Sequence, residues 1–362
     1  MPLNRHLLHV FPAFELGGAQ IRTSTWINAL GPAFRHTIVS INGRLDCRER
    51  VDPALDVHYP DAPGAGLGLP GRLRAYRHFI RETAPDVLLT NNWGSIEWTL
   101  AGRLAGAARI LHVESGFGSD EAGGDFRRRA LIRRKVLSGR VRTVVPSQTL
   151  QRRALESWGL DPACLHLVPD GIPTAKFAAA AMGRAARSAL TVGTVAVLRE
   201  EKRLDLLLDA FAALRGVMPA RLIVAGDGVE RARLEAYAEA LGMRGDVEFT
   251  GMIRDVETIY PRLDVFALSS STEQIPNSVL EAMAAGLPVA ATAAGDVPAM
   301  LAPENAPFIV PTGDAPALAA ALEALGGDAA LRQRIGLANQ RRALETYDMA
   351  VMVAAYRVLL ET

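Results

Sequence analysis

Two glutamates, Glu273 and Glu281, lie eight positions apart in a stretch with the pattern of a strand, a polar loop and then a helix. Pro276 suits the first turn of that helix, because its missing N–H is not needed there. Free backbone N–H groups and the positive end of the helix dipole make a site for phosphate. Glu281 can then accept hydrogen bonds from a ribose diol, and Glu273 can bind sugar hydroxyls, although the spacing alone also fits two solvated glutamates. The N–H groups concerned belong to Asn277, Ser278 and Val279.

Two further pairs of residues have the chemistry to meet the same phosphates. Arg199 and Lys202 follow a buried strand, three positions apart, and can direct a guanidinium and an ammonium group at a diphosphate. Gly17 and Gly18 follow the first strand, and glycines allow positive φ and a close approach of the backbone to a phosphate. A solvated helix start and a plain turn are the respective alternatives.

The first half of the chain holds candidates of a different kind. His112 ends a buried strand, where it can serve a ligand or be a hydrogen-bonded histidine of the core. Asn92 and Trp93 also follow a buried strand and can contact a sugar through hydrogen bonds and stacking. An ordinary loop is the alternative for these two residues.

A basic stretch with helical spacing covers Phe126–Leu137, with apolar residues that include Leu131, Ile132 and Val136. A basic amphipathic helix can rest on an anionic membrane or bind a phosphorylated lipid acceptor. A solvated helix face is the alternative. The arginines concerned are Arg127, Arg128, Arg129, Arg133 and Arg134.

Alternating strands and helices must position these residues. Short apolar runs alternate with helical periods in both halves, which predicts parallel strands, right-handed crossovers and two doubly wound α/β sheets. Gly171 and Pro173 follow a strand and mark a domain boundary. Ligands bind beyond the carboxyl ends of the strands in such sheets, so two facing domains would hold a ligand between them. The predicted strands are Leu7–Phe11, Thr37–Ile41, Val87–Thr90, Ile110–Val113, Val141–Val145, Leu165–Val168, Val192–Val197, Arg221–Ala225, Val247–Thr250, Val265–Leu268 and Pro288–Ala291.

Length and charge agree with two domains that meet different partners. A chain of 362 residues exceeds the usual size of a single core. Residues 1–180 carry a net charge of +7 and residues 181–362 a net charge of −6. An anionic surface or a phosphate-bearing acceptor facing the first half explains this asymmetry, and chance surface composition is the alternative.

Several classes of protein are disfavoured by the sequence. The longest uncharged apolar stretch, Ala282–Gly295, is too short to span a bilayer, and the first residues have the pattern of a strand and not of a signal peptide. Cys47 and Cys164 are the only cysteines; they give no metal-binding spacing and fit a reducing cytoplasm. We expect no nucleic-acid partner.

The stretch from Glu273 to Glu281 resembles the E-x7-E signature of the retaining glycosyltransferases of family 4. Their fold, GT-B, has two facing Rossmann-like domains and a C-terminal helix that crosses back to the first. The resemblance implies an N-terminal acceptor-side domain over residues 1–172, a C-terminal donor domain over residues 173–345 and a returning helix over residues 346–362. It extends to Gly17-Gly18-Ala19, His112, Pro169-Asp170-Gly171-Ile172, Arg199-Glu200-Glu201-Lys202, Gly226-Asp227-Gly228, Phe249-Thr250-Gly251 and Tyr347–Leu360.

The resemblance also implies roles. Gly226 and Gly251 would lie around the nucleobase, and His112 and Glu273 would orient the transferred sugar. The chain departs from the commoner family pattern at Gln274-Ile275-Pro276, where a glycine-rich loop is usual, and at Val197, where the phosphate-binding arginine is usual.

The mechanism implied by the resemblance is transfer with retention from a UDP-sugar or GDP-sugar. The chain has no Asp-x-Asp motif to hold a metal on the diphosphate, so we expect neither a metal nor a cofactor. The acceptor would be a saccharide or a lipid-linked saccharide in the assembly of lipopolysaccharide or exopolysaccharide. The location would be cytoplasmic, with or without peripheral contact to the inner face of the cell membrane. The alternatives are a nucleotide-sugar epimerase on the same fold and a non-catalytic nucleotide-sugar-binding protein.

Overall fold

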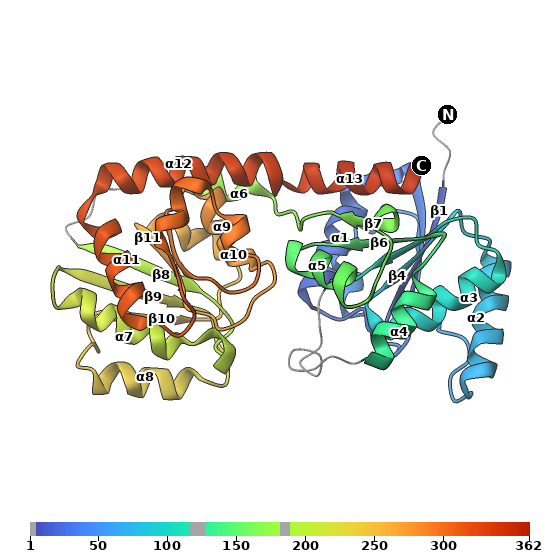
Figure 1. Ribbon diagram of the computed structural model, residues 1–362, viewed down its shortest axis with the longest axis horizontal. Helices are drawn as coiled ribbons and strands as arrows, with labels where there is room; N and C mark the ends of the chain where they lie inside the picture. Colours follow the sequence, from blue (N-terminus) through green and yellow to red (C-terminus); the bar gives the residue numbers. More distant parts are fainter. Residues whose placement is uncertain (1–4, 116–126, 182–188) are drawn as a thin grey trace. The chain divides into compact units, whose positions relative to one another are not determined.

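The computed structural model describes residues 5–115, 127–181 and 189–362. The chain forms two compact domains, which are drawn in Figure 1. The N-terminal domain consists of Met1–Asp170 and Met352–Thr362, and the C-terminal domain consists of Gly171–Val351. The chain therefore passes between the domains at Asp170 and again at Val351. Among the described residues, none of the helices has both the length and the apolar composition needed to cross a bilayer.

The N-terminal domain is built on a parallel sheet with the strand order β3-β2-β1-β4-β5-β6-β7. Its strands are β1 (Arg5–Phe11), β2 (Phe34–Ser40), β3 (Val57–His58), β4 (Val87–Asn91), β5 (Ile110–Val113), β6 (Val141–Val145) and β7 (Leu165–Leu167). Its helices are α1 (Gly18–Leu30), α2 (Leu69–Thr83), α3 (Ile96–Ala105), α4 (Arg127–Val136), α5 (Gln148–Glu156) and the greater part of α13 (Met349–Glu361).

The C-terminal domain repeats this plan with the strand order β10-β9-β8-β11-β12-β13, again all parallel. Its strands are β8 (Leu190–Val195), β9 (Ala220–Ala225), β10 (Val247–Gly251), β11 (Val265–Leu268), β12 (Val289–Thr292) and β13 (Ile309–Val310). Its helices are α6 (Thr174–Ala181), α7 (Leu204–Arg215), α8 (Arg231–Ala240), α9 (Asn277–Ala284), α10 (Val297–Met300), α11 (Ala315–Gly327) and α12 (Ala329–Thr346). The predicted α/β class with two doubly wound sheets is confirmed.

Strand residues of the C-terminal sheet are buried on both faces. In β11, Val265 and Ala267 belong to one apolar cluster, and Phe266 and Leu268 belong to another. Successive side chains of a strand point to opposite faces, so the sheet is covered on both sides. Helices α7, α8 and α11 cover one face, and α6 and α9 cover the other (Figure 1). Such strands appear in the sequence as continuous apolar runs, which is why most were predicted within two residues.

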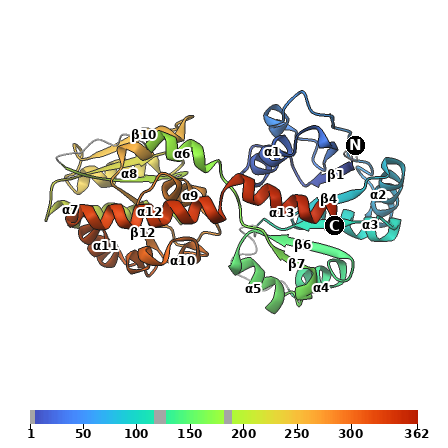
Figure 2. The ribbon, with the colours of Figure 1, turned by 90° about the horizontal axis from the view of Figure 1, so that it is seen from above.

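Helix α12 supports α9 from outside the sheet. The two helices lie side by side in Figure 2, and the Gln340 amide donates a 3.0 Å hydrogen bond to the Ala284 carbonyl at the end of α9. Gly336 allows this approach, since a Cβ there would lie 2.1 Å from the Gly286 carbonyl oxygen. These contacts fix the helix that carries Glu281.

The last turn of α13 is bound within the N-terminal domain by arginines. Arg5 and Arg109 donate hydrogen bonds of 2.7 Å and 2.9 Å to the Leu360 carbonyl, and Arg142 donates one of 3.1 Å to the Leu359 carbonyl. The last carbonyls of a helix lack intrahelical partners and carry partial negative charge. Guanidinium groups donate hydrogen bonds to these carbonyls and also offset their charge.

Both sheets change winding direction next to their first strand. β1 has β2 and β4 as neighbours, and β8 has β9 and β11. Ligands of doubly wound sheets bind at this switch point, beyond the carboxyl ends of the strands. The loops after β1 and β4, and those after β8 and β11, are therefore where the candidate residues should meet.

Candidate functional site

The switch point of the C-terminal sheet brings Lys202 and Glu273 together. Lys202 lies in a single 3-10 turn after β8, and Glu273 lies in the loop after β11. The Lys202 Nζ atom is 2.6 Å from Glu273 Oε1, and the exposed fractions of the two side chains are 23% and 9%. The sequence predicted separate contacts to phosphate and to sugar. The structure shows that the two groups neutralise each other within the domain.

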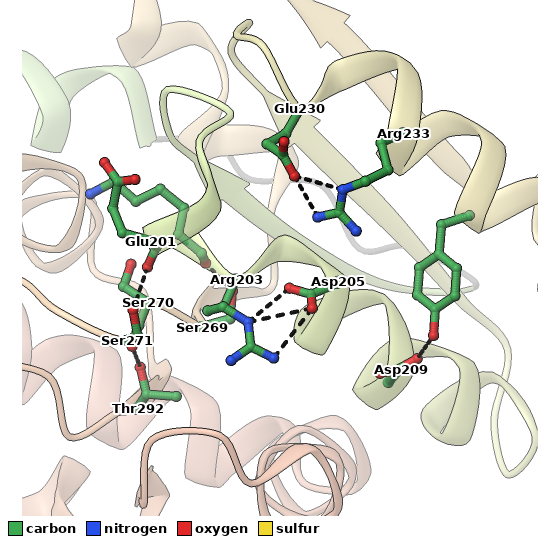
Figure 3. A network of polar contacts seen from close by, with 12 residues as sticks. Glu201, Arg203, Asp205, Asp209, Glu230, Arg233, Ser269, Ser270, Ser271 and Thr292 are labelled. Carbon is green, nitrogen blue, oxygen red and sulfur yellow. Dashed lines mark hydrogen bonds and ion pairs between the residues drawn. The ribbon is translucent and has the colours of Figure 1, made fainter.

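A serine-rich loop, Ser269–Ser271, holds this ion pair. The Ser270 hydroxyl donates a 2.6 Å hydrogen bond to Glu273 Oε1, and the Ser269 hydroxyl donates one of 2.8 Å to the Lys202 carbonyl. The Ser271 N–H donates a 2.9 Å bond to the Glu201 carbonyl. Figure 3 shows the three serines beside Glu201, with Thr292 of β12 bonded to the Ser270 carbonyl at 2.7 Å. Three strands thus fix one cation and one carboxylate.

Arg203 differs from its neighbour Lys202 in having a partner outside the site. Its guanidinium group donates hydrogen bonds of 3.1 Å to 3.4 Å to the Asp205 carboxylate (Figure 3). Arg199, in contrast, is exposed and makes no ion pair with the residues that the structure describes. Arg199 and Lys202 therefore supply the positive charge at this switch point.

Gly295 was not predicted as a site residue, yet it shapes the loop that carries Glu273. It has a φ of 55°, and a Cβ atom there would lie 2.0 Å from the Glu273 carbonyl oxygen. The next N–H, of Asp296, donates a 3.2 Å hydrogen bond to the Gln274 carbonyl. Only glycine allows this approach without strain. The signal in the sequence was a glycine just after a buried strand, at the sheet edge where ligands bind.

The start of α9 leaves fewer free N–H groups than the sequence predicted. Pro276 is the N-cap, and the Val279 N–H donates a 3.0 Å bond to its carbonyl oxygen. The prediction that Val279 offers a free N–H is therefore wrong, because the first turn closes with a tight i to i+3 bond. The N–H groups of Asn277 and Ser278 have no hydrogen-bond partner among the described residues and remain at the helix end for an anion.

Glu281 lies in the second turn of α9 and is largely buried. The Tyr260 hydroxyl donates a short hydrogen bond to Glu281 Oε2. Burial raises the pKa of Glu281 to about 7, although the bond from Tyr260 and the positive charge of Lys176 act in the opposite direction. Tyr260 was not predicted as a site residue, because a tyrosine between Ile259 and Pro261 has nothing in its sequence pattern to distinguish it from a core residue.

Three glycines near the predicted nucleobase region have structural roles. Gly226 has a φ of 132°, and a Cβ there would lie 1.8 Å from the Ala196 carbonyl oxygen. Gly251 has a φ of 72° and accepts a 3.0 Å bond from the Gly226 N–H. A Cβ at Gly228 would lie 2.3 Å from the Leu198 carbonyl oxygen. These glycines let the loops after β8, β9 and β10 pack together, and contact with a nucleobase stays a prediction.

In the N-terminal domain, Gly17 and Gly18 begin α1. Gly17 is the N-cap, with φ of −132° and ψ of 160°, and neither glycine has positive φ. The expectation of positive φ is wrong, because the chain enters the helix from an extended conformation. The N–H groups of the first turn still point away from the helix, as an anion site requires.

His112 is fully buried at the end of β5. Its Nδ1 atom lies 2.9 Å from the Thr90 hydroxyl, and its Nε2 atom lies 3.5 Å from Glu114 Oε2. Glu114 is buried as well and pairs with Arg133, whose Nε is 3.2 Å from the same oxygen. His112 therefore sits in a polar network inside the domain, and a contact with the sugar stays a prediction.

The assignment of Arg133 to an exposed basic face is wrong. Its side chain is only 2% exposed, and its guanidinium lies 4.9 Å from the Trp93 ring centroid and 4.4 Å from that of Trp158. The reason is that α4 packs against the sheet on this side, where the pair with Glu114 and the two rings offset the cost of burial. Arg127, Arg128 and Arg134 are exposed, and Arg129 lies over the Trp93 ring at 5.3 Å.

Asn92 fixes the loop after β4. It has a φ of 58°, and its Oδ1 atom accepts a 2.8 Å hydrogen bond from the Ser115 N–H. Trp93 follows it and packs against Arg133. Both residues therefore have structural partners, and a sugar contact stays a prediction. Phe126 of the predicted basic helix and the glycine-rich residues 116–118 after Glu114 lie outside the described residues.

A cavity of about 550 Å³ lies at the opposite edge of the C-terminal sheet. It is lined by residues at the amino ends of the strands, including Thr191 of β8 and Val247 of β10. Ligand sites of doubly wound sheets lie at the carboxyl ends instead. The candidate site is therefore the switch point with its charged groups.

Comparison with known proteins agrees with this division of the chain. Residues 17–171 match the glycosyl transferase 4-like domain, and residues 187–328 match the glycosyl transferases group 1 family. Together the two matches cover most of both domains.

Individual relatives are named as glycosyltransferases. The lipopolysaccharide core biosynthesis glycosyltransferase LpsE of Rhizobium meliloti is 33% identical over 161 residues, 44% of this chain and 46% of LpsE. The chain thus spans about half the length of LpsE. The 2-deoxystreptamine N-acetyl-D-glucosaminyltransferase of Streptomyces fradiae is 29% identical over 84% of each chain. The crystal structure of Anabaena HepE in complex with UDP superposes with a TM-score of 0.83 at 17% identity, over 99% of both chains.

Proposed function

The chain belongs to the group 1 glycosyltransferases, and from this we propose that it transfers a sugar from a nucleoside diphosphate sugar bound at the switch point of its C-terminal domain. The observation that carries the proposal is the pairing of Lys202 with Glu273 beside the exposed Arg199. These groups lie where ligands of such sheets bind. A diphosphate offers the anion that can replace Glu273 as the partner of Lys202.

Binding of the donor would proceed by exchange of partners. The ammonium group of Lys202 leaves Glu273 Oε1 and binds the diphosphate, with Arg199 and the N–H groups at the start of α9 as further donors. The Glu273 carboxylate is then free to accept hydrogen bonds from hydroxyls of the transferred sugar. Glu281 binds the ribose. One substrate would thus provide partners for Lys202, Arg199, Glu273 and Glu281.

We propose retention of configuration and no need for a metal. Charge that develops on the leaving diphosphate would be stabilised by Lys202, Arg199 and the helix dipole, groups that are already positioned in the folded domain. The departing phosphate would accept the proton of the acceptor hydroxyl on the same face of the sugar. His112 would contribute to the orientation of the sugar from its buried network.

The proposed acceptor is a saccharide or lipid-linked saccharide of a cell-surface polysaccharide. The name of LpsE, a lipopolysaccharide core biosynthesis glycosyltransferase, supports this class of acceptor. A cytoplasmic location is part of the proposal. Contact with the inner face of the membrane would use the exposed Arg127, Arg128 and Arg134 of α4. Anionic liposomes should retain the protein, and they should retain less of it when these three arginines are replaced by glutamine.

The direct test is calorimetric titration with a panel of UDP-sugars and GDP-sugars, followed by analysis of the products. The proposal expects one donor to bind, to bind more weakly to Glu281→Ala, and to transfer its sugar with retained anomeric configuration. Conversion of the donor to another sugar without an acceptor would favour an epimerase. Binding with no turnover on any saccharide would favour a non-catalytic protein. No binding by any member of the panel would overturn the proposal.

A further inference from the structure

The hydrogen bond between Tyr260 and Glu281 joins two buried groups behind the proposed donor site. Tyr260 is fully buried, and its ring packs edge-on against Phe177 at 5.6 Å and tilted against Phe266 at 6.1 Å. Its hydroxyl donates to Glu281 Oε2, with the Ser278 carbonyl at 3.4 Å as a second acceptor. The ring therefore holds the hydroxyl in one place.

Among the residues that the structure describes, no cation bonds to Glu281. From α6, Lys176 adds positive charge near Glu281, but its Nζ atom pairs with Glu257 Oε1 at 2.9 Å. Glu257, in the 3-10 turn before Tyr260, adds negative charge. From α12, Gln340 bonds the far end of α9. The strands β11 and β12 packed behind α9 contain no charged residue.

Arg342 of α12 bonds to backbone carbonyls and not to Glu281. Arg342 donates hydrogen bonds of 2.8 Å and 2.7 Å to the carbonyls of Met300 and Ala299. A buried carboxylate that lacks a cation relies on hydrogen-bond donors for its stability. For Glu281, the donor in the structure is the Tyr260 hydroxyl.

We propose that Tyr260 is a positioning residue of the donor site, which holds the Glu281 carboxylate in the orientation and in the ionised state that bind the ribose diol. This proposal rests on the proposed function, because it concerns the same donor. Its consequence is that donor binding releases a proton to the solvent. The free protein holds that proton on Glu281 in part of its molecules, and the ribose hydroxyls bind only the ionised carboxylate.

The pKa of Glu281, about 7, places this coupling near neutral pH. Affinity for the donor should rise with pH up to about 7 and level off above it. At pH 5.5 only about one molecule in thirty would be ionised, so affinity should be roughly 30-fold weaker than at pH 8.5. All seven histidines lie in the N-terminal domain, so no histidine of the C-terminal domain can produce this dependence.

The test is the pH profile of donor affinity between pH 5.5 and 8.5 for the full chain and two variants. The probe is UDP-glucose or GDP-mannose, whichever binds, because a nucleotide-sugar diphosphate has no group that titrates in this range. Tyr260→Phe keeps the ring and its packing and removes only the hydroxyl. Its profile should move to higher pH and its affinity at pH 7 should fall by about tenfold, as loss of a hydrogen bond to a charged group implies. Glu281→Gln should bind weakly at every pH, with no dependence on it.

The outcomes separate this proposal from the proposed function. A Tyr260→Phe profile that coincides with that of the wild type, or a wild-type affinity that does not vary with pH, would overturn the role of Tyr260. Absence of binding by the wild type at every pH would instead overturn the donor site itself. Calorimetry in buffers of different ionisation enthalpy should show proton uptake by the buffer at pH 7 for the wild type and none for Glu281→Gln.

Discussion

Each domain buries a glutamate that follows a strand of its sheet, but the two glutamates have different kinds of partner. Glu114 in the N-terminal domain pairs with Arg133, whose guanidinium lies 4.9 Å and 4.4 Å from the ring centroids of two tryptophans. Glu281 in the C-terminal domain bonds to a tyrosine hydroxyl and to no cation of the described part of the chain, and its pKa rises to about 7. Removing the counterion of a buried charge is strongly destabilising, whereas a buried carboxylate without a counterion costs stability and is a candidate for ligand binding.

The unfolding of each domain can be followed by its own spectroscopic signal, so the stabilities of the two domains can be compared. All four tryptophans and all seven histidines lie in the N-terminal domain. Tryptophan fluorescence therefore reports on that domain alone, and far-ultraviolet circular dichroism reports on both. Their difference isolates the unfolding of the C-terminal domain.

The largest expected effect is loss of stability when the paired carboxylate is removed. Glu114→Gln removes the buried carboxylate that pairs with the Arg133 guanidinium, so the free energy of unfolding of the N-terminal domain should fall by about 3–5 kcal/mol. Tryptophan fluorescence during urea unfolding measures it. The matched control is Glu97→Gln, whose partner Arg72 is partly exposed at 35%, and which should cost about 1 kcal/mol or less. Equal effects of the two variants would contradict a structural role for the buried pair.

Removing the charge of Glu281 is expected to raise the free energy of unfolding, opposite to the effect of removing Glu114. The pKa of Glu281 rises to about 7 in the folded protein, so between its ordinary value of 4.5 and 7 the folded state holds a proton that the unfolded state releases. Stability therefore falls as pH rises through this range, by about 3 kcal/mol in all.

Glu281→Gln removes that cost. The C-terminal domain of this variant should be more stable than the wild type by about 3 kcal/mol at pH 8.5 and about equally stable at pH 4.5. Circular dichroism during urea unfolding at the two pH values measures the difference. Glu239→Gln, at an exposed glutamate, should change nothing. A C-terminal domain that is less stable in Glu281→Gln than in the wild type at pH 8.5 would contradict the claim that the charge of Glu281 costs stability.

The histidines of the N-terminal sheet should make that domain the more acid-sensitive one. His9 Nε2 and His36 Nδ1 lie 3.0 Å apart in adjacent strands, and burial lowers the pKa of both, that of His36 to about 4. Below pH 6.5 the unfolded state binds a proton at His36 that the folded state does not bind until about pH 4, so stability is lost as pH falls through this window. His36 alone should cost about 2 kcal/mol at pH 5.

Tryptophan fluorescence is well placed to detect this transition, because Trp26 lies 5.5 Å from His9. The signal should change before the C-terminal part of the circular dichroism signal does. His36→Gln should move the transition to lower pH, and the exposed His78→Gln should leave it unchanged. Simultaneous acid unfolding of both domains, unaltered in His36→Gln, would contradict this account.

The smallest effect concerns the exchange of partners at Lys202. Glu273→Gln frees the ammonium group of Lys202, so the affinity for UDP or GDP without a sugar should increase several-fold, about 1 kcal/mol. The rate of sugar transfer should fall in the same variant, because the carboxylate that binds the sugar is gone. Titration calorimetry and a transfer assay measure the two effects. A loss of affinity for the free nucleotide would show that Glu273 does not compete with it.

The fold was predictable from sequence because fully buried parallel strands are continuous apolar runs. Strand β11 was predicted with its observed bounds, whereas β3 and β13 were missed, since two residues carry no periodicity. The positions of Lys202 and Glu273 were predictable from their elements, but their mutual ion pair was not. It depends on Ser270 and on the approach of Gly295, far apart in sequence.

The sequence does not show which charged residues are buried in the folded protein. Arg133 has the neighbours of an exposed basic helix, and only the packing of α4 against Trp93 and Trp158 shows otherwise. Tyr260 is a second case. Its sequence neighbours do not indicate the hydrogen bond to Glu281, which forms only when η8, the 3-10 turn Tyr260–Arg262, meets α9.

The most direct test of the donor site is the affinity of the nucleoside diphosphate for Lys202→Ala, measured by calorimetry beside the wild type. Lys135→Ala is the matched control, because Lys135 is an exposed lysine of the N-terminal domain. We predict that Lys202→Ala binds UDP or GDP at least tenfold more weakly, as loss of a charge-assisted bond of about 1.5–3 kcal/mol implies, and that Lys135→Ala binds as the wild type does. Undiminished binding by Lys202→Ala, with the wild type binding, would place the nucleotide elsewhere in the molecule.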